Sequence, residues 1–167
     1  FIENYKGAKN TLPVTVWMNG GPGCASKIAF TKIAPYLLPL DSPYIADQDL
    51  IANPHTWLNL TNILFIDNPA GVGYSVNTDS KYIYNDKNTA QDTLDAIVIF
   101  SQQSFLNIYK PILFNGESYA GKYIPDLALL IYAYNSQHQT KQINLKGLLL
   151  GNPAIQFKSG SLEDSNI

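Results

Sequence analysis

Four short apolar runs, each closed by a turn rich in glycine, proline or asparagine, constrain the fold of this chain more than any other feature. They span residues 12–18, 62–67, 112–115 and 145–150. Two longer stretches with apolar residues near helical spacing, 85–107 and 119–134, precede the third and the fourth run. Buried strands that alternate with helices are typical of a mostly parallel α/β sheet with flanking helices.

The rest of the chain adds little regular structure to this expectation. We predict one short helix over 26–34 and a proline-rich loop over 35–54. No repeat or linker interrupts the alternation, so residues 1–167 are predicted to form one domain or a part of one.

Composition narrows the class of protein. Hydrophobic residues make up 46% of the chain and charged residues 14%, which indicates a globular protein with a real core. The net charge is −2 and the lysines are scattered, so no basic face predicts binding to nucleic acid or anionic lipid. The longest apolar runs are too short to span a bilayer.

Ser118 follows the third predicted strand within Gly116-Glu117-Ser118-Tyr119-Ala120. This is the G-x-S-x-G pattern of a sharp strand-to-helix turn, with alanine at the last position. Such a turn exposes the serine hydroxyl at the carboxyl end of the strand. The alternative is a serine that caps the following helix.

A second glycine cluster, residues 19–23, follows the first predicted strand. Hydrolases with this type of α/β fold place an oxyanion donor there, because glycines let the backbone approach a substrate. The alternative is a plain turn. Two such turns at the carboxyl ends of parallel strands fit the rule that open α/β sheets bind ligands at that edge.

Four stretches resemble one known family. WMNGGPGCAS, NPAGVGYS, GESYAGKYIP and LKGLLLGNP are similar to the motifs of the serine carboxypeptidases, and they occur in the same order between residues 1 and 153. Members of that family have the α/β-hydrolase fold and remove single residues from peptide C-termini. They act in lysosomes, in vacuoles or outside the cell.

The resemblance implies a catalytic role for three positions. Ser118 would be the nucleophile, and the backbone N–H groups of Gly21 and Tyr119 would form the oxyanion hole. It also implies an acid and a histidine later in the chain. The two histidines present, His55 and His138, match no such position, so we expect the acid and the histidine downstream of Ile167.

The resemblance further implies a site for the terminal carboxylate of the substrate. Asn19 and Glu117 would hold that carboxylate, with Trp17 and Gly20 in support. Two carboxylates that face each other repel unless one keeps a proton. The family usually has a glutamate where this chain has Lys32, which could pair with Glu117 or point into solvent.

Two further residues bear on the cellular compartment in which the protein folds. Cys24 is the only cysteine, so it is a free thiol or pairs with sequence not shown. The resemblance implies a partner far downstream and an oxidising compartment. Asn59 begins the sequon Asn59-Leu60-Thr61, which permits glycosylation in a secretory protein.

The leading interpretation is a serine carboxypeptidase in a lysosome, in a vacuole or outside the cell, which acts on peptide or protein C-termini. No cofactor and no metal are expected, and a homodimer stays open. An acyltransferase on the same scaffold is one alternative. A catalytically dead relative that serves as a binding or structural subunit is the other, and Lys32 favours it somewhat.

Overall fold

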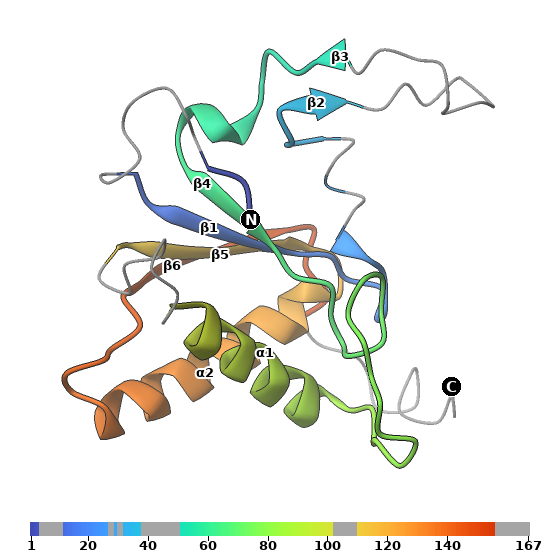
Figure 1. Cartoon of the computed structure of the whole chain (residues 1–167), viewed down its shortest axis with the longest axis vertical. Coiled ribbons are helices and arrows are strands. Elements are labelled where there is room, and N and C mark those ends of the chain that lie inside the picture. The colour runs from blue at the N-terminus through green and yellow to red at the C-terminus, as the bar shows by residue number, and fades with distance from the viewer. Residues whose placement is uncertain (4–11, 27–28, 30–31, 38–50, 102–109, 156–167) are drawn as a thin grey trace.

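A four-stranded parallel sheet forms the centre of the molecule (Figure 1). The computed structural model describes residues 1–3, 12–26, 29, 32–37, 51–101 and 110–155. The strands lie in the order β4-β1-β5-β6. Their bounds are Val14–Met18 for β1, Asn62–Phe65 for β4, Ile112–Glu117 for β5 and Leu145–Gly151 for β6. The four predicted strands and their parallel arrangement are confirmed, with ends that differ by one or two residues.

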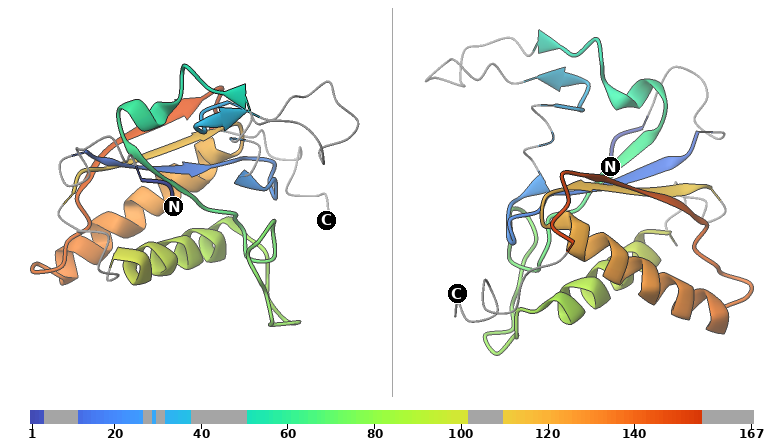
Figure 2. Two further views of the ribbon diagram at one scale, coloured as in Figure 1. Left: turned by 45° about the horizontal axis from the view of Figure 1, so that its top comes forward. Right: turned by 180° about the vertical axis from the view of Figure 1, so that it is seen from behind.

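Two helices cover one face of this sheet (Figures 1 and 2). Helix α1 spans Asp86–Ser101 and α2 spans Ala120–Gln137. Both predicted helices are present. The first was expected to run to residue 107, of which 102–109 lie outside the described residues, and the second continues three residues beyond the predicted end. None of the described helices combines the length and apolar character that crossing a membrane requires.

Strict alternation along β1 divides the interior into two clusters. Val14, Val16 and Met18 are buried under the helices, together with Phe114 of β5. Trp17 points to the opposite face, where it packs in a second and smaller cluster. That second cluster also contains Ala29, Ile33, Trp57 and Phe65. Adjacent strand residues point to opposite faces. One face of the sheet therefore packs against the two helices, and the other face carries the cluster around Trp17.

Short elements lie on the side of the second face, where the described residues form no long helix (Figure 1). Strands β2, Tyr36–Leu37, and β3, Ile51–Ala52, pair antiparallel, and the 3₁₀ helix η3 spans Trp57–Asn59. The prediction of a proline-rich loop over 35–54 was therefore wrong at its two ends, and residues 38–50 lie outside the described residues. The amide of Asn53 donates to the carbonyl of Pro35 at 2.9 Å, which brings those ends together.

The predicted short helix over 26–34 falls partly on residues outside the description. In the described part, the amides of Lys32 and Ile33 both donate to the carbonyl of Ala29. These bonds hold Lys32 and Ile33 next to Ala29, and Ile33 packs with Ala29 in the cluster around Trp17.

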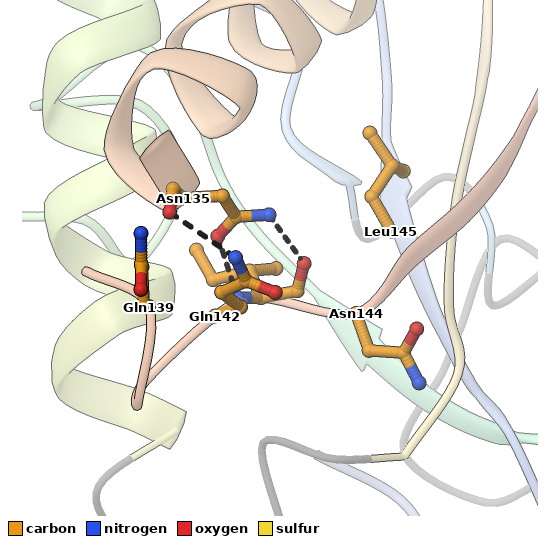
Figure 3. A pocket seen from close by; sticks show the side chains of 6 residues that line it. Asn135, Gln139, Gln142, Asn144 and Leu145 are labelled. Atoms are coloured by element: carbon orange, nitrogen blue, oxygen red, sulfur yellow. Dashed lines mark hydrogen bonds between the residues drawn. The ribbon is translucent and has the colours of Figure 1, made fainter. Parts of the chain in front are cut away.

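The connection from α2 to β6 is fixed by Asn135 (Figure 3). Its side chain donates to the carbonyl of Ile143 and accepts from the amide of the same residue, each at 2.8 Å. Gln142 donates to the Asn135 carbonyl at 3.3 Å. A polar hollow of about 320 Å³ lies beside these residues, at the amino end of β6. Ser118 follows β5 and so lies at the carboxyl edge of this parallel sheet. The polar hollow is therefore at the opposite end of the sheet from Ser118.

Candidate active site

Ser118 occupies the turn between β5 and α2, and its side chain is exposed. Its φ of 61° lies in the left-handed region, which residues with a Cβ rarely adopt. Three backbone hydrogen bonds hold it there: its amide donates to Gly151 at 3.0 Å, and its carbonyl accepts from Gly121 and Ala154 at 2.9 Å each. A strained residue that its surroundings fix so firmly is a feature of functional sites.

The Ser118 hydroxyl does not cap the helix. Helix α2 begins after Tyr119 without a side-chain cap, and none of the described residues hydrogen-bonds to the Ser118 side chain. The capping alternative is therefore not what the structure shows. The hydroxyl is left at the carboxyl edge of the sheet, facing solvent.

The glycine loop after β1 lies directly against this turn. A Cβ added to Gly20 would sit 2.3 Å from the amide nitrogen of Tyr119, 2.7 Å from the Glu117 carbonyl and 3.0 Å from the Ser118 Cβ. Only glycine allows this approach. The N–H of Gly21 has no hydrogen-bond partner among the described residues, and Gly21 has a φ of 117°. The two glycine turns that the sequence singled out thus meet at one place.

A buried serine ties the glycine loop to the end of β4. The Ser26 hydroxyl donates to the carbonyl of Ile66 at 2.5 Å and accepts from the amide of Asn19 at 3.2 Å. Its amide donates to the Asp67 carboxylate at 2.6 Å. The Asp67 carboxylate also accepts from the amide of Tyr74 at 2.9 Å. Sequence reasoning missed Ser26 and Asp67, because nothing in their local pattern marks two residues 41 positions apart as partners.

Two tyrosines support the turn from the side of the helices. The Tyr119 hydroxyl donates to Asp86 at the start of α1, at 3.0 Å, and the Gly23 amide donates to the Tyr123 hydroxyl at 3.3 Å. The two rings meet edge to face at 5.0 Å. Burial raises the pKa of Tyr123 to about 12, partly offset by the bond from Gly23. Burial and the bond to Asp86 raise the pKa of Tyr119 above its usual range. The sequence carried one signal for this pair: the two tyrosines are four residues apart at the start of a predicted helix, so they lie on the same helix face.

Asn19 and Trp17 lie side by side. The indole N–H of Trp17 donates to Oδ1 of Asn19 at 2.8 Å. Because an indole nitrogen only donates, this bond fixes the orientation of the Asn19 amide. The NH₂ group of that amide therefore points away from the indole N–H and can donate to another group. The Trp17 ring packs edge to face on Trp57, with ring centres 5.6 Å apart.

Glu117 lies on the same face of the sheet as Trp17. Trp17 is in register with Asn115 of β5, so the residue two positions further, Glu117, points the same way. Its Oε2 is 3.1 Å from Nζ of Lys32, and the two side chains are 40% and 54% exposed. Of the two orientations considered for Lys32, pairing with Glu117 is the one observed.

Beside this pair is an open hollow of about 660 Å³. Glu117 lines it together with Trp17 and Trp57, and residues 148–152 of β6 and the following turn form the other wall. Leu149 is 52% exposed there. The hollow begins one residue from Ser118 and its walls are largely apolar, which suits an apolar group of a ligand.

Neither histidine reaches Ser118. His138 stacks on Tyr134, with ring centres 4.1 Å apart, at the far end of α2. Since α2 has 18 residues, that end is about 27 Å from Ser118. His55 is exposed, in the turn between β3 and η3.

Within the described part of the chain, no cluster of three or more histidine, cysteine or acidic residues could hold a metal ion.

Cys24 and Asn59 are both exposed. Cys24 follows the glycine loop, where its amide donates to the carbonyl of Gly20 at 3.1 Å, and its thiol is free. Asn59 is the last residue of η3. Both side chains are therefore accessible, Cys24 to a disulfide partner and Asn59 to modification.

Comparison with known proteins identifies relatives of this chain. The chain is 39% identical over 161 residues to serine carboxypeptidase-like 44 of Arabidopsis thaliana, which covers 94% of this chain and 32% of that protein. It is 38% identical over 161 residues to the mouse lysosomal protective protein, covering 95% of this chain and 31% of that protein. The chain thus spans about a third of the length of the curated relatives it matches.

A solved structure supports the same relationship. Kex1(Δ)p, a prohormone-processing carboxypeptidase from Saccharomyces cerevisiae, superposes with a TM-score of 0.78 at 28% identity. The match covers 92% of this chain and 33% of that one. The parallel sheet with its helices is that of the α/β-hydrolase fold. The family model described as "Serine carboxypeptidase" matches residues 1–164. The chain belongs to the serine carboxypeptidase family.

Proposed function

We propose that the protein that carries this chain is a serine-type carboxypeptidase and that Ser118 is its nucleophile. The observation that carries this proposal is the contact between the two turns: Gly20 lies against the Tyr119 amide nitrogen, next to a strained and exposed Ser118. A nucleophilic serine needs such a turn, because its hydroxyl must stand clear of the sheet beside backbone donors.

The proposed reaction follows from this arrangement. The Ser118 Oγ attacks the scissile carbonyl while a base takes its proton, and the carbonyl oxygen becomes an oxyanion between the N–H groups of Gly21 and Tyr119. The protonated base then gives the proton to the leaving amine, which is the released C-terminal residue. Water hydrolyses the acyl-enzyme by the same steps. The base and its acid are proposed to lie in sequence beyond Ile167.

The preference for C-termini is proposed to come from the residues beside the nucleophile. Asn19 and Glu117 would bind the terminal carboxylate, with Trp17 orienting Asn19 and Gly20 holding the loop in place. The substrates would be peptide or protein C-termini. A lysosomal, vacuolar or secreted location fits the relatives and the exposed Cys24, which we propose to pair with a cysteine outside this chain.

The test is made on the full-length protein. A fluorophosphonate should label it at one residue, and Ser118→Ala should abolish both the labelling and the release of C-terminal residues from peptides. Ser136→Ala, at an exposed position near the end of α2, is the control and should change neither. Labelling that survives Ser118→Ala would contradict the assignment of the nucleophile.

The same experiment separates the alternatives. Labelling without peptide hydrolysis, but with transfer of an acyl group from an ester to an alcohol, would identify an acyltransferase. A protein that neither labels nor turns over would be a dead relative with a binding or structural role.

A further inference from the structure

We propose that the ammonium group of Lys32 receives the terminal carboxylate of the substrate, so that this site recognises an anion with a cation. The inference rests on the proposed function, which supplies the peptide substrate. It changes the chemistry of the site, because a carboxylate pair must retain a proton to bind an anion, whereas a lysine needs none.

The main-chain carbonyls from Lys32 to Ala34 accept three hydrogen bonds from side chains. The buried Asn53 side chain donates to the Lys32 carbonyl at 3.1 Å and to the Ala34 carbonyl at 2.9 Å. The hydroxyl of Thr56 donates to the carbonyl of Ile33 at 3.0 Å, and Ile33 is buried against Trp17. Lys32 therefore starts from a fixed point, and only its side chain has freedom.

The contact with Glu117 aims this side chain at the proposed substrate site. Nζ of Lys32 lies 3.1 Å from Glu117 Oε2, although the two residues are 85 positions apart in the sequence. Glu117 is the residue before the nucleophile and lines the open hollow. Lysine has three N–H donors, and one bond to Glu117 leaves two for a ligand.

The charges at this point favour a bound anion. Lys32 and Glu117 neutralise each other, and the pair is half-exposed, so an incoming carboxylate meets no net negative charge and can share the ammonium group. The amide NH₂ of Asn19 is a further donor next to Trp17, and Trp17 also lines the hollow. The apolar walls formed by Trp57 and Leu149 would accept the side chain of the last residue.

The chain offers a matched control. Lys122 also forms an ion pair at 3.1 Å, with Asp126 one turn further along α2, and its side chain is 37% exposed. Lys122→Gln removes the same charge as Lys32→Gln and breaks an ion pair of the same length. An effect of overall charge would therefore appear in both variants.

The experiment compares binding and turnover for a blocked dipeptide ending in phenylalanine and for its C-terminal amide. Binding is measured by calorimetry on full-length protein with Ser118→Ala, and kcat and KM on the protein with Ser118 intact. Lys32→Gln should weaken binding of the free acid roughly 10- to 100-fold and change that of the amide by less than about threefold, because one charge-assisted hydrogen bond is lost. Lys32→Arg should restore most of the difference, and Lys122→Gln should leave it unchanged.

The inference is overturned if Lys32→Gln weakens both ligands equally, or leaves both unchanged, while the protein still folds and hydrolyses peptides. Failure of the proposed function looks different: peptide hydrolysis is then absent, or persists in Ser118→Ala. The calorimetric ratio of acid to amide reports on Lys32 in either case, because it does not need turnover.

Discussion

Ser118 and its neighbour Glu117 are held in place in opposite ways. The backbone of Ser118 is fixed by three main-chain hydrogen bonds and by the contact of Gly20 with the turn. The side chain of Glu117 is held by one ion pair between half-exposed groups. Exposed pairs of this kind contribute little to stability. The difference teaches that the proposed nucleophile depends on backbone packing with no room for an added side chain at Gly20, whereas the proposed recognition of the substrate depends on exposed side chains that can be exchanged without disturbing the fold.

The strongest test of this comparison is Gly20→Ala. The new methyl group would overlap the Tyr119 amide nitrogen and the Glu117 carbonyl, so the loop must move away from the turn. We expect a loss of about 1–3 kcal/mol in the free energy of unfolding and at least a hundredfold loss of kcat in the full-length protein. Denaturant unfolding and peptide hydrolysis measure the two effects.

Gly147→Ala is the control for this substitution. Its methyl group would approach only the end of the Leu113 side chain, at 3.3 Å, far along β6 from Ser118. Activity should be unchanged. If Gly20→Ala is as active as Gly147→Ala, the contact between the turns has no role in the reaction.

A smaller effect is expected from Ser26→Ala. The substitution leaves the carbonyl of Ile66 and the amide of Asn19 without the hydroxyl that joins them, while the bond from the residue 26 amide to Asp67 persists. Stability should fall by about 1–3 kcal/mol, and kcat should fall with it because the glycine loop loosens. A fall in stability without any change in kcat would show that Ser26 supports the fold alone.

The strain at Ser118 gives a third prediction. Both Ser118→Gly and Ser118→Ala remove the hydroxyl, but only glycine adopts a φ of 61° without strain. The glycine variant should therefore be more stable than the alanine variant by about 1 kcal/mol in denaturant unfolding. Equal stabilities would mean that the turn relaxes when the hydroxyl is removed, and that it is less rigid than its hydrogen bonds indicate.

The smallest effect concerns alkaline pH. The raised pKa of Tyr123 favours its neutral form in the folded protein, so its contribution to stability is complete below pH 10 and is lost as pH rises to about 12. Absorbance at 295 nm should show one tyrosine fewer titrating near pH 12 in Tyr123→Phe. Tyr132→Phe, exposed on the same helix, is the matched control. Identical curves for the two variants would contradict the burial of the Tyr123 hydroxyl.

The fold was largely predictable because its signals are local. An apolar run followed by glycine or proline marks the end of a buried strand, and the four strands of the parallel sheet were found in this way. The two short strands β2 and β3 were not found, because two residues each carry no periodic pattern and their pairing depends on Asn53 and Pro35.

In the candidate site, too, the locally encoded features were predictable and the long-range contacts were not. By itself the sequence determined that Ser118 would stand at a tight turn and that a glycine loop would follow β1, because small residues at these positions are requirements of the local backbone. Only the tertiary structure decided that Lys32 pairs with Glu117, that Tyr119 reaches Asp86 and that Ser26 reaches Asp67. Each of these contacts joins segments more than thirty residues apart. Their partners are chosen by the order in which the strands pack and by the face to which each residue points, and no local pattern encodes either of these.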